Sequence, residues 1–401
     1  MYGLPYVLKD CYSTRGIRTT CASRVLVDYV PEYDATVVTK LKKAGAVLMG
    51  KMNMDAWGHG GSSENTDFGP VHNPWDITRV AGGSSGGPAV AVATRMCLFA
   101  IGGDTGGSIR SPAGWCNVTG LKVTYGRVSR YGTIAYASSF DSVGPIAKTA
   151  EDCAAVLEVI AGWDPYDATS LPDENVSYVR GINKGVKDLR IGWPKEFFDT
   201  DLDREVKQLI GKAVRELEKL GARVVEVSLP SLEYAVATYY VLAPAETSSN
   251  LARYDGIRFG QGRENFSEET KRRIMIGTYA LSAGYYDAFY RKAQQARMVI
   301  IKDYQRAFNQ CDVILAPISP TPPTKIGELV NDPIKNLLAD IYTVTQNSAG
   351  IPSLAVPCGF TSENLPIGMQ IQGKKFSEAL LLRIGYAYQQ VTDWHKRRPK
   401  L

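Results

Sequence analysis

The stretch GGSSGGPAVAVATRMCLFAIGGDTGGSIRSP, residues 82–112, decides the fold of this chain. It holds two loops rich in glycine and serine, which are separated by an Ala/Val-rich segment typical of a helix and an apolar run typical of a strand. One helix and one strand return the second loop to the end of the sheet where the first one lies. We therefore expect Ser84 and Ser108, one from each loop, to lie close together.

The rest of the chain repeats this alternation of helix and strand. Apolar residues at helical spacing predict helices over 34–44, 149–161, 202–220 and 288–309, and short apolar strands over 46–49, 223–227 and 313–315. Asp34 and Thr149 stand where N-caps are expected. The alternation predicts an α/β fold with a large, mostly buried sheet. Because no break in composition divides the 401 residues, we expect one large domain.

Composition excludes several classes of protein. The chain is 44% hydrophobic and 22% charged, which is typical of a globular protein and not of a disordered one. Its net charge of +5 is spread along the sequence and gives little support for direct binding of nucleic acid. The seven cysteines are scattered without a CxxC pair, which predicts reduced core thiols and no zinc site. With no apolar run long enough for a bilayer, a cytoplasmic protein is expected.

The chain has only three histidines, and this limits the catalytic machinery that it can use. His395 lies in a polar tail and His72 in a turn-rich segment, so neither is a convincing general base. His59, in a glycine-flanked run, could line a site, but a structural role is the better interpretation. A mechanism without histidine is therefore favoured.

The glycines before Ser108 favour nucleophilic catalysis. Gly106 and Gly107 leave backbone N–H groups unobstructed beside the serine, as in an oxyanion hole. The serine needs a base, and Lys9 fits because it ends the hydrophobic run 5–8, where burial disfavours the charged form. Glycines that only make tight turns, and a solvated Lys9, are the alternatives. A phosphate-binding loop is disfavoured because no Gly-Lys-Ser/Thr ending follows.

Three motifs, GLPYVLKD (3–10), GGSSGG (82–87) and GDTGGSIRSP (103–112), together resemble the amidase signature family. The resemblance implies a single large amidase domain over 1–401, with a mixed central β-sheet covered by helices on both faces. It also implies Ser108 as nucleophile, Ser84 as a bridging serine after a cis Gly83–Ser84 bond, and Lys9 as base. The oxyanion hole of the family matches the backbone N–H groups of Thr105, Gly106, Gly107 and Ser108.

Further stretches, 125–132, 137–141 and 254–258, are similar to the glutaminase subunits of tRNA-dependent amidotransferases. This resemblance implies hydrolysis of free glutamine through an acyl-enzyme, with the ammonia passed to a partner subunit. The residues that bind glutamine match Tyr239, Arg273 and Asp340. Their chemistry suits a zwitterion, because a guanidinium pairs with the α-carboxylate and a carboxylate pairs with the α-ammonium.

The same resemblance implies the partners. This chain would bind no cofactor and no metal, whereas ATP and Mg are expected at the partner that converts Glu-tRNA(Gln) to Gln-tRNA(Gln). The expected assembly is a heterotrimer with the amidotransferase B and C subunits. The tRNA would be held mainly by the partner subunit, and no membrane would be involved.

Two departures from the family leave alternatives open. The chain begins almost at the lysine motif, where the family has helical sequence before it, and the excursion near 260–271 is shorter than usual. A free-standing amidase acting on other amides, or an inactive, truncated interaction subunit, are the alternatives. Intact Lys9, Ser84 and Ser108 argue against the inactive subunit.

Overall fold

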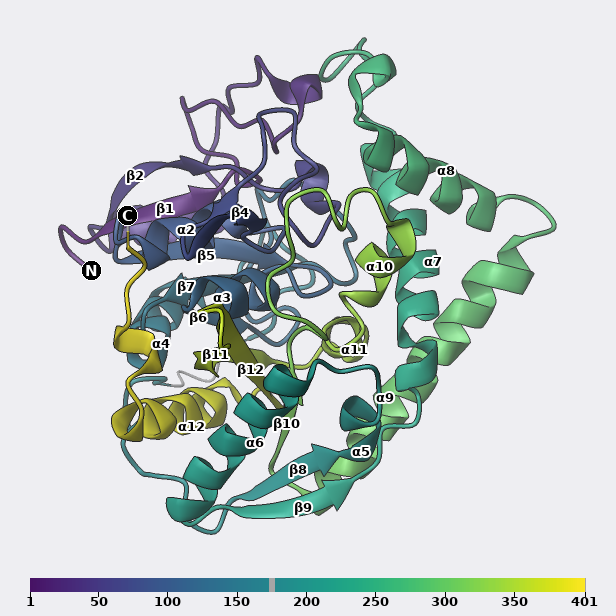
Figure 1. The fold of residues 1–401 in the computed structure, drawn as a ribbon. Coiled ribbons are helices and arrows are strands. Elements are labelled where there is room, and N and C mark those ends of the chain that lie inside the picture. Colours follow the sequence, from purple (N-terminus) through teal and green to yellow (C-terminus); the bar gives the residue numbers. More distant parts are fainter. Residues whose placement is uncertain (173–176, 401) are drawn as a thin grey trace.

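The computed structural model describes residues 1–172 and 177–400, and its centre is a sheet of ten strands (Figure 1). In sheet order these are β2 (Val47–Met52), β1 (Pro5–Lys9), β5 (Phe99–Asp104), β7 (Ser142–Ala147), β6 (Thr119–Lys122), β11 (Ser353–Phe360), β12 (Pro366–Gly373), β10 (Val313–Pro317), β8 (Arg190–Pro194) and β9 (Arg223–Val227). The pairs β2–β1, β1–β5, β10–β8 and β8–β9 are parallel, and the central pairs are antiparallel. The mixed sheet predicted from the resemblance is confirmed.

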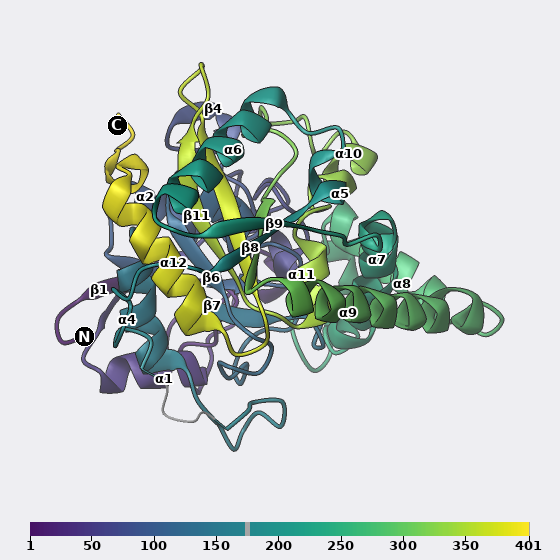
Figure 2. The same cartoon turned by 90° about the horizontal axis from the view of Figure 1, so that it is seen from below.

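Helices cover both faces of this sheet. The helices of the described chain are α1 (Thr36–Lys43), α2 (Gly86–Ala93), α3 (Arg110–Cys116), α4 (Ala150–Ile160), α5 (Lys195–Phe198), α6 (Arg204–Lys219), α7 (Leu232–Leu251), α8 (Glu268–Leu281), α9 (Lys292–Gln310), α10 (Pro333–Leu338), α11 (Val344–Ala349) and α12 (Glu378–Val391). Strand β5 shows the two faces, because Phe99 and Ile101 join the core beneath α4, whereas Ala100 joins the core beneath α2 and α3. In Figure 2, α4 and α12 lie side by side on their face.

One of the two predicted N-caps is confirmed and the other is wrong. The Thr149 hydroxyl accepts from the N–H of Asp152 and caps α4. Asp34 does not cap α1, whose N-cap is Ala35 without a side-chain hydrogen bond. The Asp34 carboxylate instead accepts from the N–H of Arg15 at 2.8 Å and pairs with Lys42 at 2.6 Å. The Arg15 N–H and the Lys42 ammonium therefore take the place of the helix N–H groups that Asp34 was expected to bind.

Helices α7, α8 and α9 gather on the side of the molecule opposite both chain ends (Figure 1). The segment 260–271, predicted as a shortened excursion, contains a short 3-10 helix (η3, Arg263–Asn265) and the first turn of α8. A π-helical stretch, η4 (Tyr286–Arg291), precedes α9, so this helix begins later than predicted. Packing of α7 against α8 and α9 holds these helices together beside the sheet.

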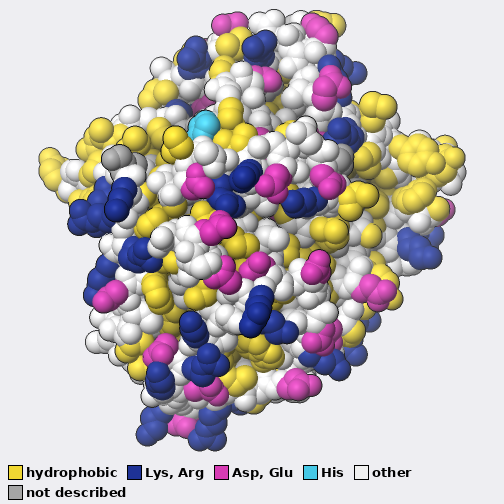
Figure 3. Space-filling model, viewed as in Figure 1, with side chains coloured by type: hydrophobic (Ala, Val, Ile, Leu, Met, Phe, Trp, Pro, Cys, Tyr) yellow, Lys and Arg dark blue, Asp and Glu magenta, His cyan; other side chains and the backbone are white. Residues whose placement is uncertain are grey.

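The surface and the core agree with the predictions from composition. Acidic and basic side chains are interspersed over the face shown in Figure 3. All seven cysteines are buried and unbridged. Within the described residues, no helix combines the length and the apolar character needed to cross a membrane.

Candidate active site

Lys9 ends strand β1, which lies between β2 and β5 inside the sheet. Its side chain is buried, with the residue only 3% exposed. The Nζ atom donates to Ser84 Oγ at 2.6 Å and to the carbonyl of Gly103, at the end of β5, at 3.0 Å. The structure therefore brings the predicted lysine and bridging serine into direct contact.

The Ser84 loop is held by close backbone contacts that only glycine permits. A Cβ atom on Gly82, whose φ is +79°, would lie 2.9 Å from Pro112 Cα. A Cβ atom on Gly83 would lie 2.0 Å from Asp55 Oδ2. The Gly83–Ser84 peptide bond is cis, as the resemblance implied. The close packing at Gly82 and Gly83 leaves no room for larger side chains in this loop, whose Ser84 hydroxyl accepts from Lys9.

Ser108 lies in the turn between β5 and α3, and a buried carboxylate shapes this turn. Asp104 accepts from the N–H of Gly107 at 2.9 Å and from that of Ile109 at 3.0 Å, and its oxygens also pair with Arg110. The N–H of Ser85 donates to the Ser108 carbonyl at 3.1 Å and joins the two loops. In the described parts of the chain, no hydrogen bond connects the Ser84 and Ser108 hydroxyls.

The four N–H groups expected in the oxyanion hole differ in their partners. The Gly107 N–H donates to Asp104, so its use in a hole would require that bond to be shared or broken. Among the described residues, the N–H groups of Thr105, Gly106 and Ser108 have no hydrogen-bond partner. A developing oxyanion beside Ser108 therefore has three unengaged donors within the predicted set.

The three residues expected to bind the substrate come from α7, α8 and the turn before α11. The Arg273 guanidinium donates from Nε to Glu269 at 2.8 Å and from Nη1 to the Tyr136 hydroxyl at 2.6 Å. Asp340 accepts from the Tyr240 hydroxyl at 2.8 Å. The Arg273 Cζ atom lies 5.3 Å from the centre of the Tyr240 ring. Tyr240 thus joins the two charged groups.

This charged cluster adjoins the nucleophile loop. A Cβ atom on Gly106 would lie 2.6 Å from the Tyr239 hydroxyl. Thr343, three residues after Asp340, donates from its hydroxyl to the Gly106 carbonyl at 2.6 Å. The structure therefore places Tyr239 and the Asp340 turn directly against the backbone that precedes Ser108.

Burial changes the proton affinity of several groups around the site. It raises the pKa of Asp340 to about 6, although Tyr240 and Arg273 act to lower it. Burial also raises the pKa of Asp55, beside Gly83, to about 7. The pKa of Tyr239 lies well above its ordinary value for the same reason, so this phenol is protonated at neutral pH.

His59 has a structural position, as the sequence favoured. Its ring is completely buried, with hydrogen bonds to the hydroxyls of Thr270 and Thr247 at 3.3 and 3.2 Å. The ring also packs edge-on against Tyr136, with centroids 4.7 Å apart. Burial holds the pKa of His59 well below its ordinary value, and the neutral ring supports the tyrosine that contacts Arg273.

Sequence reasoning missed Tyr136, Tyr240, Glu269 and Asp55. Tyr136 carries no local signal, because its partner Arg273 lies 137 positions away. Asp55 accepts from the N–H groups of Ser63 and Asn65, 8 and 10 positions further on, and no motif marks these contacts. Glu269 stands one helical turn before Arg273, and this spacing is the signal that could have indicated an ion pair. Tyr240 follows Tyr239 directly, but only the packing of α7 shows that both face the site.

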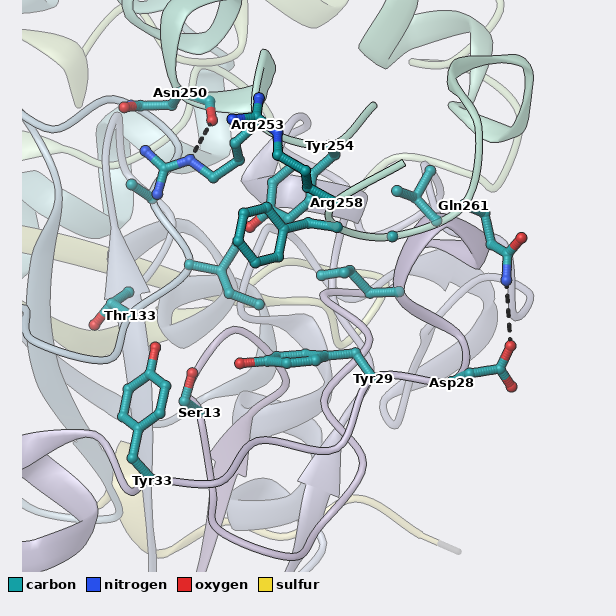
Figure 4. Close-up of a pocket in the computed structure, with 16 residues that line it drawn as sticks. Ser13, Asp28, Tyr29, Tyr33, Thr133, Asn250, Arg253, Tyr254, Arg258 and Gln261 are labelled. Carbon is teal, nitrogen blue, oxygen red and sulfur yellow. Dashed lines mark hydrogen bonds between the residues drawn. The ribbon is translucent and has the colours of Figure 1, made fainter. Parts of the chain in front are cut away.

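A pocket of about 570 Å³ opens near the site, between the loop around 25–33 and the segment 250–261. Figure 4 shows Tyr29, Tyr33 and Arg253 among the side chains around it. Thr133 and Ile134 line this pocket and also line a cavity of about 30 Å³ that Lys9 borders. No cluster of three or more potential metal ligands occurs among the described residues.

Known proteins resemble this chain over nearly its whole length. The family model described as Amidase matches residues 1–382. The A subunit of glutamyl-tRNA(Gln) amidotransferase from Desulfatibacillum aliphaticivorans is 53% identical over 414 aligned positions, covering 100% of this chain and 85% of the relative. The same protein from Thermodesulfovibrio yellowstonii is 51% identical over 413 positions, with coverage of 100% and 85%. The crystal structure of its Thermotoga maritima counterpart superposes with a TM-score of 0.88 at 46% identity, covering 98% of this chain and 84% of that chain.

Proposed function

The chain belongs to the amidase family, and on this basis we propose that it is the glutaminase subunit of a glutamyl-tRNA(Gln) amidotransferase. In this proposal it hydrolyses free glutamine and supplies ammonia to a partner subunit. The relatives that are more than half identical over the whole chain support the assignment. The observation that carries it is the pair of opposite charges, Arg273 and Asp340, beside the nucleophile loop.

The first half of the reaction forms an acyl-enzyme. Ser108 Oγ attacks the side-chain carbonyl carbon of glutamine while its proton passes through the Ser84 hydroxyl to a neutral Lys9. The carbonyl oxygen becomes an oxyanion next to the unengaged backbone N–H groups of the turn. When the C–N bond breaks, Lys9 returns a proton through Ser84 to the leaving nitrogen. Ammonia leaves, and the glutamyl group remains on Ser108 as an ester.

The second half repeats these proton transfers with water. A water molecule attacks the ester carbon, gives a proton through Ser84 to Lys9, and releases glutamate as the proton returns to Ser108 Oγ. The Lys9–Ser84 hydrogen bond of 2.6 Å supports this relay. The contact between Ser84 and Ser108 would form when substrate fills the site, because catalytic hydrogen bonds are often loose in the empty enzyme.

Glutamine would be held by its two charged groups. Arg273 would pair with the α-carboxylate and Asp340 with the α-ammonium, and Tyr239 would line the pocket against Gly106. A neutral amide offers neither charge, so the pair supports glutamine over other amides. The chain needs no cofactor in this scheme, and ATP and Mg would act on the partner subunit.

A subunit that supplies ammonia needs a partner surface and an exit. Exposed aromatic side chains from the end of α8, from η4 and from the segment between them, Tyr279, Phe289 and Tyr285, form an apolar surface of the kind that partners cover. Because Thr133 and Ile134 line both the cavity at Lys9 and the open pocket, we propose that ammonia leaves past these two residues. We propose B and C subunits as the partners, in a cytoplasmic heterotrimer that binds tRNA mainly through the partner.

The test is a glutaminase assay of the chain with and without its partner subunits. The proposal expects release of ammonia from glutamine, and formation of Gln-tRNA(Gln) only by the complete complex. Butyramide, which is glutamine without its α-ammonium and α-carboxylate, is the control substrate. Hydrolysis of butyramide as efficient as that of glutamine would favour a free-standing amidase, and no acylation of Ser108 would favour an inactive interaction subunit.

A further inference from the structure

Tyr240 lies between the two charged groups of the site. From α7 its hydroxyl donates to Asp340 Oδ2 at 2.8 Å, while the Arg273 Cζ atom lies over its ring at 5.3 Å. It also meets the Tyr239 ring edge-on, with centroids 5.0 Å apart. The Tyr240 side chain therefore contacts both Asp340 and Arg273, the two charged groups that would bind the substrate.

Each charged group keeps one polar atom without a partner. Arg273 uses Nε for Glu269 and Nη1 for Tyr136, and its Nη2 makes no hydrogen bond within the described residues. Asp340 uses Oδ2 for Tyr240, and its Oδ1 likewise has no hydrogen bond there. A Cβ atom on Gly61 would lie 3.4 Å from this Oδ1, so the glycine keeps the space beside the oxygen open.

We propose that Tyr240 is a positioning residue that determines specificity for α-amino acid amides. Its hydroxyl fixes one carboxylate oxygen of Asp340 and leaves the other for an ammonium group. Its ring supports the guanidinium of Arg273 and leaves Nη2 for a carboxylate. This inference rests on the proposed function, because it names the residue that sets the distance between the two binding groups.

The charge state of Tyr240 suits this role. Burial raises the pKa of the phenol well above its ordinary value, so the hydroxyl remains a donor at neutral pH. The groups that face Asp340 are Tyr240 on α7 and Arg273 on α8, with Asp104 and Arg110 of the nucleophile turn also acting on its charge. Of these, Tyr240 is the one that donates a hydrogen bond to the carboxylate.

The test uses Tyr240→Phe and four amides that share the carbon chain from the amide to the α position. Glutamine carries both charges, 4-aminobutyramide only the ammonium, glutaramate only the carboxylate, and butyramide neither. Losing a hydrogen bond to a charged group should raise KM for glutamine and 4-aminobutyramide roughly 10- to 150-fold. The kcat values should stay within about twofold of those of the unmodified chain. The KM values for glutaramate and butyramide should also stay within about twofold, since neither amide has an ammonium for Asp340 to bind.

Tyr240→Leu extends the test to the ring. Removal of the ring from beneath Arg273 should also raise KM for glutaramate, by roughly 2- to 30-fold. In Tyr240→Phe, Asp340 loses a donor that stabilises its charged form. The rise of KM for glutamine in acid should therefore begin at a higher pH than in the unmodified chain. Tyr125→Phe is the matched control, since it removes a hydroxyl that donates to the Ser138 carbonyl at 2.8 Å and not to Asp340.

The outcomes separate this inference from the proposed function. If the unmodified chain hydrolyses glutamine and Tyr240→Phe keeps its KM, Tyr240 has no such role, although the glutaminase stands. An equal loss on all four amides would assign Tyr240 to the fold and overturn the inference. Failure of the unmodified chain and its complex to hydrolyse glutamine would overturn the proposed function itself.

Discussion

Lys9 Nζ lies 2.6 Å from Ser84 Oγ, although 75 positions separate the two residues in the sequence. The contact depends on β1 ending next to β5, where the Gly103 carbonyl takes a second hydrogen bond from the same Nζ atom. A single flexible amine, enclosed by the sheet, can give and take a proton at the serine. Arginine at this place could not.

Lys9→Arg tests the lysine as base. Arginine keeps the positive charge but does not deprotonate in proteins, so glutaminase activity should fall by several orders of magnitude, as far as in Lys9→Ala. Steady-state release of ammonia from glutamine measures this. Circular dichroism shows whether the variants fold, and turnover near that of the unmodified chain by Lys9→Arg would reduce Lys9 to a structural cation.

Gly83→Ala tests the packing of the bridging-serine loop. The new Cβ atom would lie 2.0 Å from Asp55 Oδ2, so the loop must move away from Asp55 and carry Ser84 with it. A displacement of this size should lower kcat/KM for glutamine roughly 100-fold.

Gly211→Ala is the matched control for that substitution. Gly211 lies inside α6 with no atom within 4 Å of the new Cβ position. This change should leave activity unaltered and increase the free energy of unfolding by about 0.5–1 kcal/mol. Equal activity of the two alanine variants would show that the Gly83 contact does not position Ser84.

The pH dependence of glutamine binding follows from Asp340. Its pKa, raised by burial to about 6, means that the carboxylate is charged above this pH and protonated below it. Because only the charged form pairs with an ammonium, KM for glutamine should rise about tenfold per pH unit below that pKa. Measurement of KM from pH 5 to pH 8, with butyramide as reference, checks this.

Asp340→Asn should abolish this rise of KM for glutamine in acid and leave the pH dependence of KM for butyramide unchanged. If KM for both substrates rose together in acid, a group other than Asp340, such as the buried Asp55 carboxyl, would control the KM profile.

The buried pair of Asp104 and Arg110 should be essential for stability. Both side chains are completely enclosed, and Arg110 also donates to Gln346, Gln370 and Asn347. Arg110→Met leaves the Asp104 charge without its partner and should lower the free energy of unfolding by about 3–5 kcal/mol. Urea unfolding of Arg110→Met and of the double variant Asp104→Asn/Arg110→Met measures this, and the double variant should regain part of the loss.

The same pair of residues also predicts how the stability of the fold changes in acid. Burial acts to raise the pKa of Asp104, but Arg110 and the backbone donors hold it well below its ordinary value. The stabilisation is therefore complete above the ordinary carboxyl pKa of about 4 and is lost as the pH falls below it. A loss of less than about 1 kcal/mol in Arg110→Met would contradict this account of the pair.

The sequence predicted the parts of the site that lie within short motifs. Lys9, Ser84 and Ser108 could be named because glycines and an apolar strand end mark them locally, and the structure places Lys9 in contact with Ser84. Their catalytic roles stay predictions. Tyr240 and Tyr136 could not be found, since their partners Asp340 and Arg273 lie 100 and 137 positions away.

The helices show the same limit of local information. The helix predicted over 202–220 is confirmed as α6, because its apolar face is strictly periodic. The Asp34 cap failed because a backbone N–H and Lys42, which local propensity does not weigh, bind its carboxylate. Specific contacts of the carboxylates, and not helix propensity, decided both that cap and the substrate cluster.

Release of ammonia from glutamine by Ser108→Ala tests the central claim most directly. The account predicts that this variant, assembled with its partner subunits, loses glutamine-dependent activity by several orders of magnitude and still forms Gln-tRNA(Gln) from free ammonium. Intact-mass analysis of the unmodified chain, quenched during turnover, should show one added glutamyl group that the variant lacks. Glutamine-dependent turnover that survived in Ser108→Ala would contradict the account.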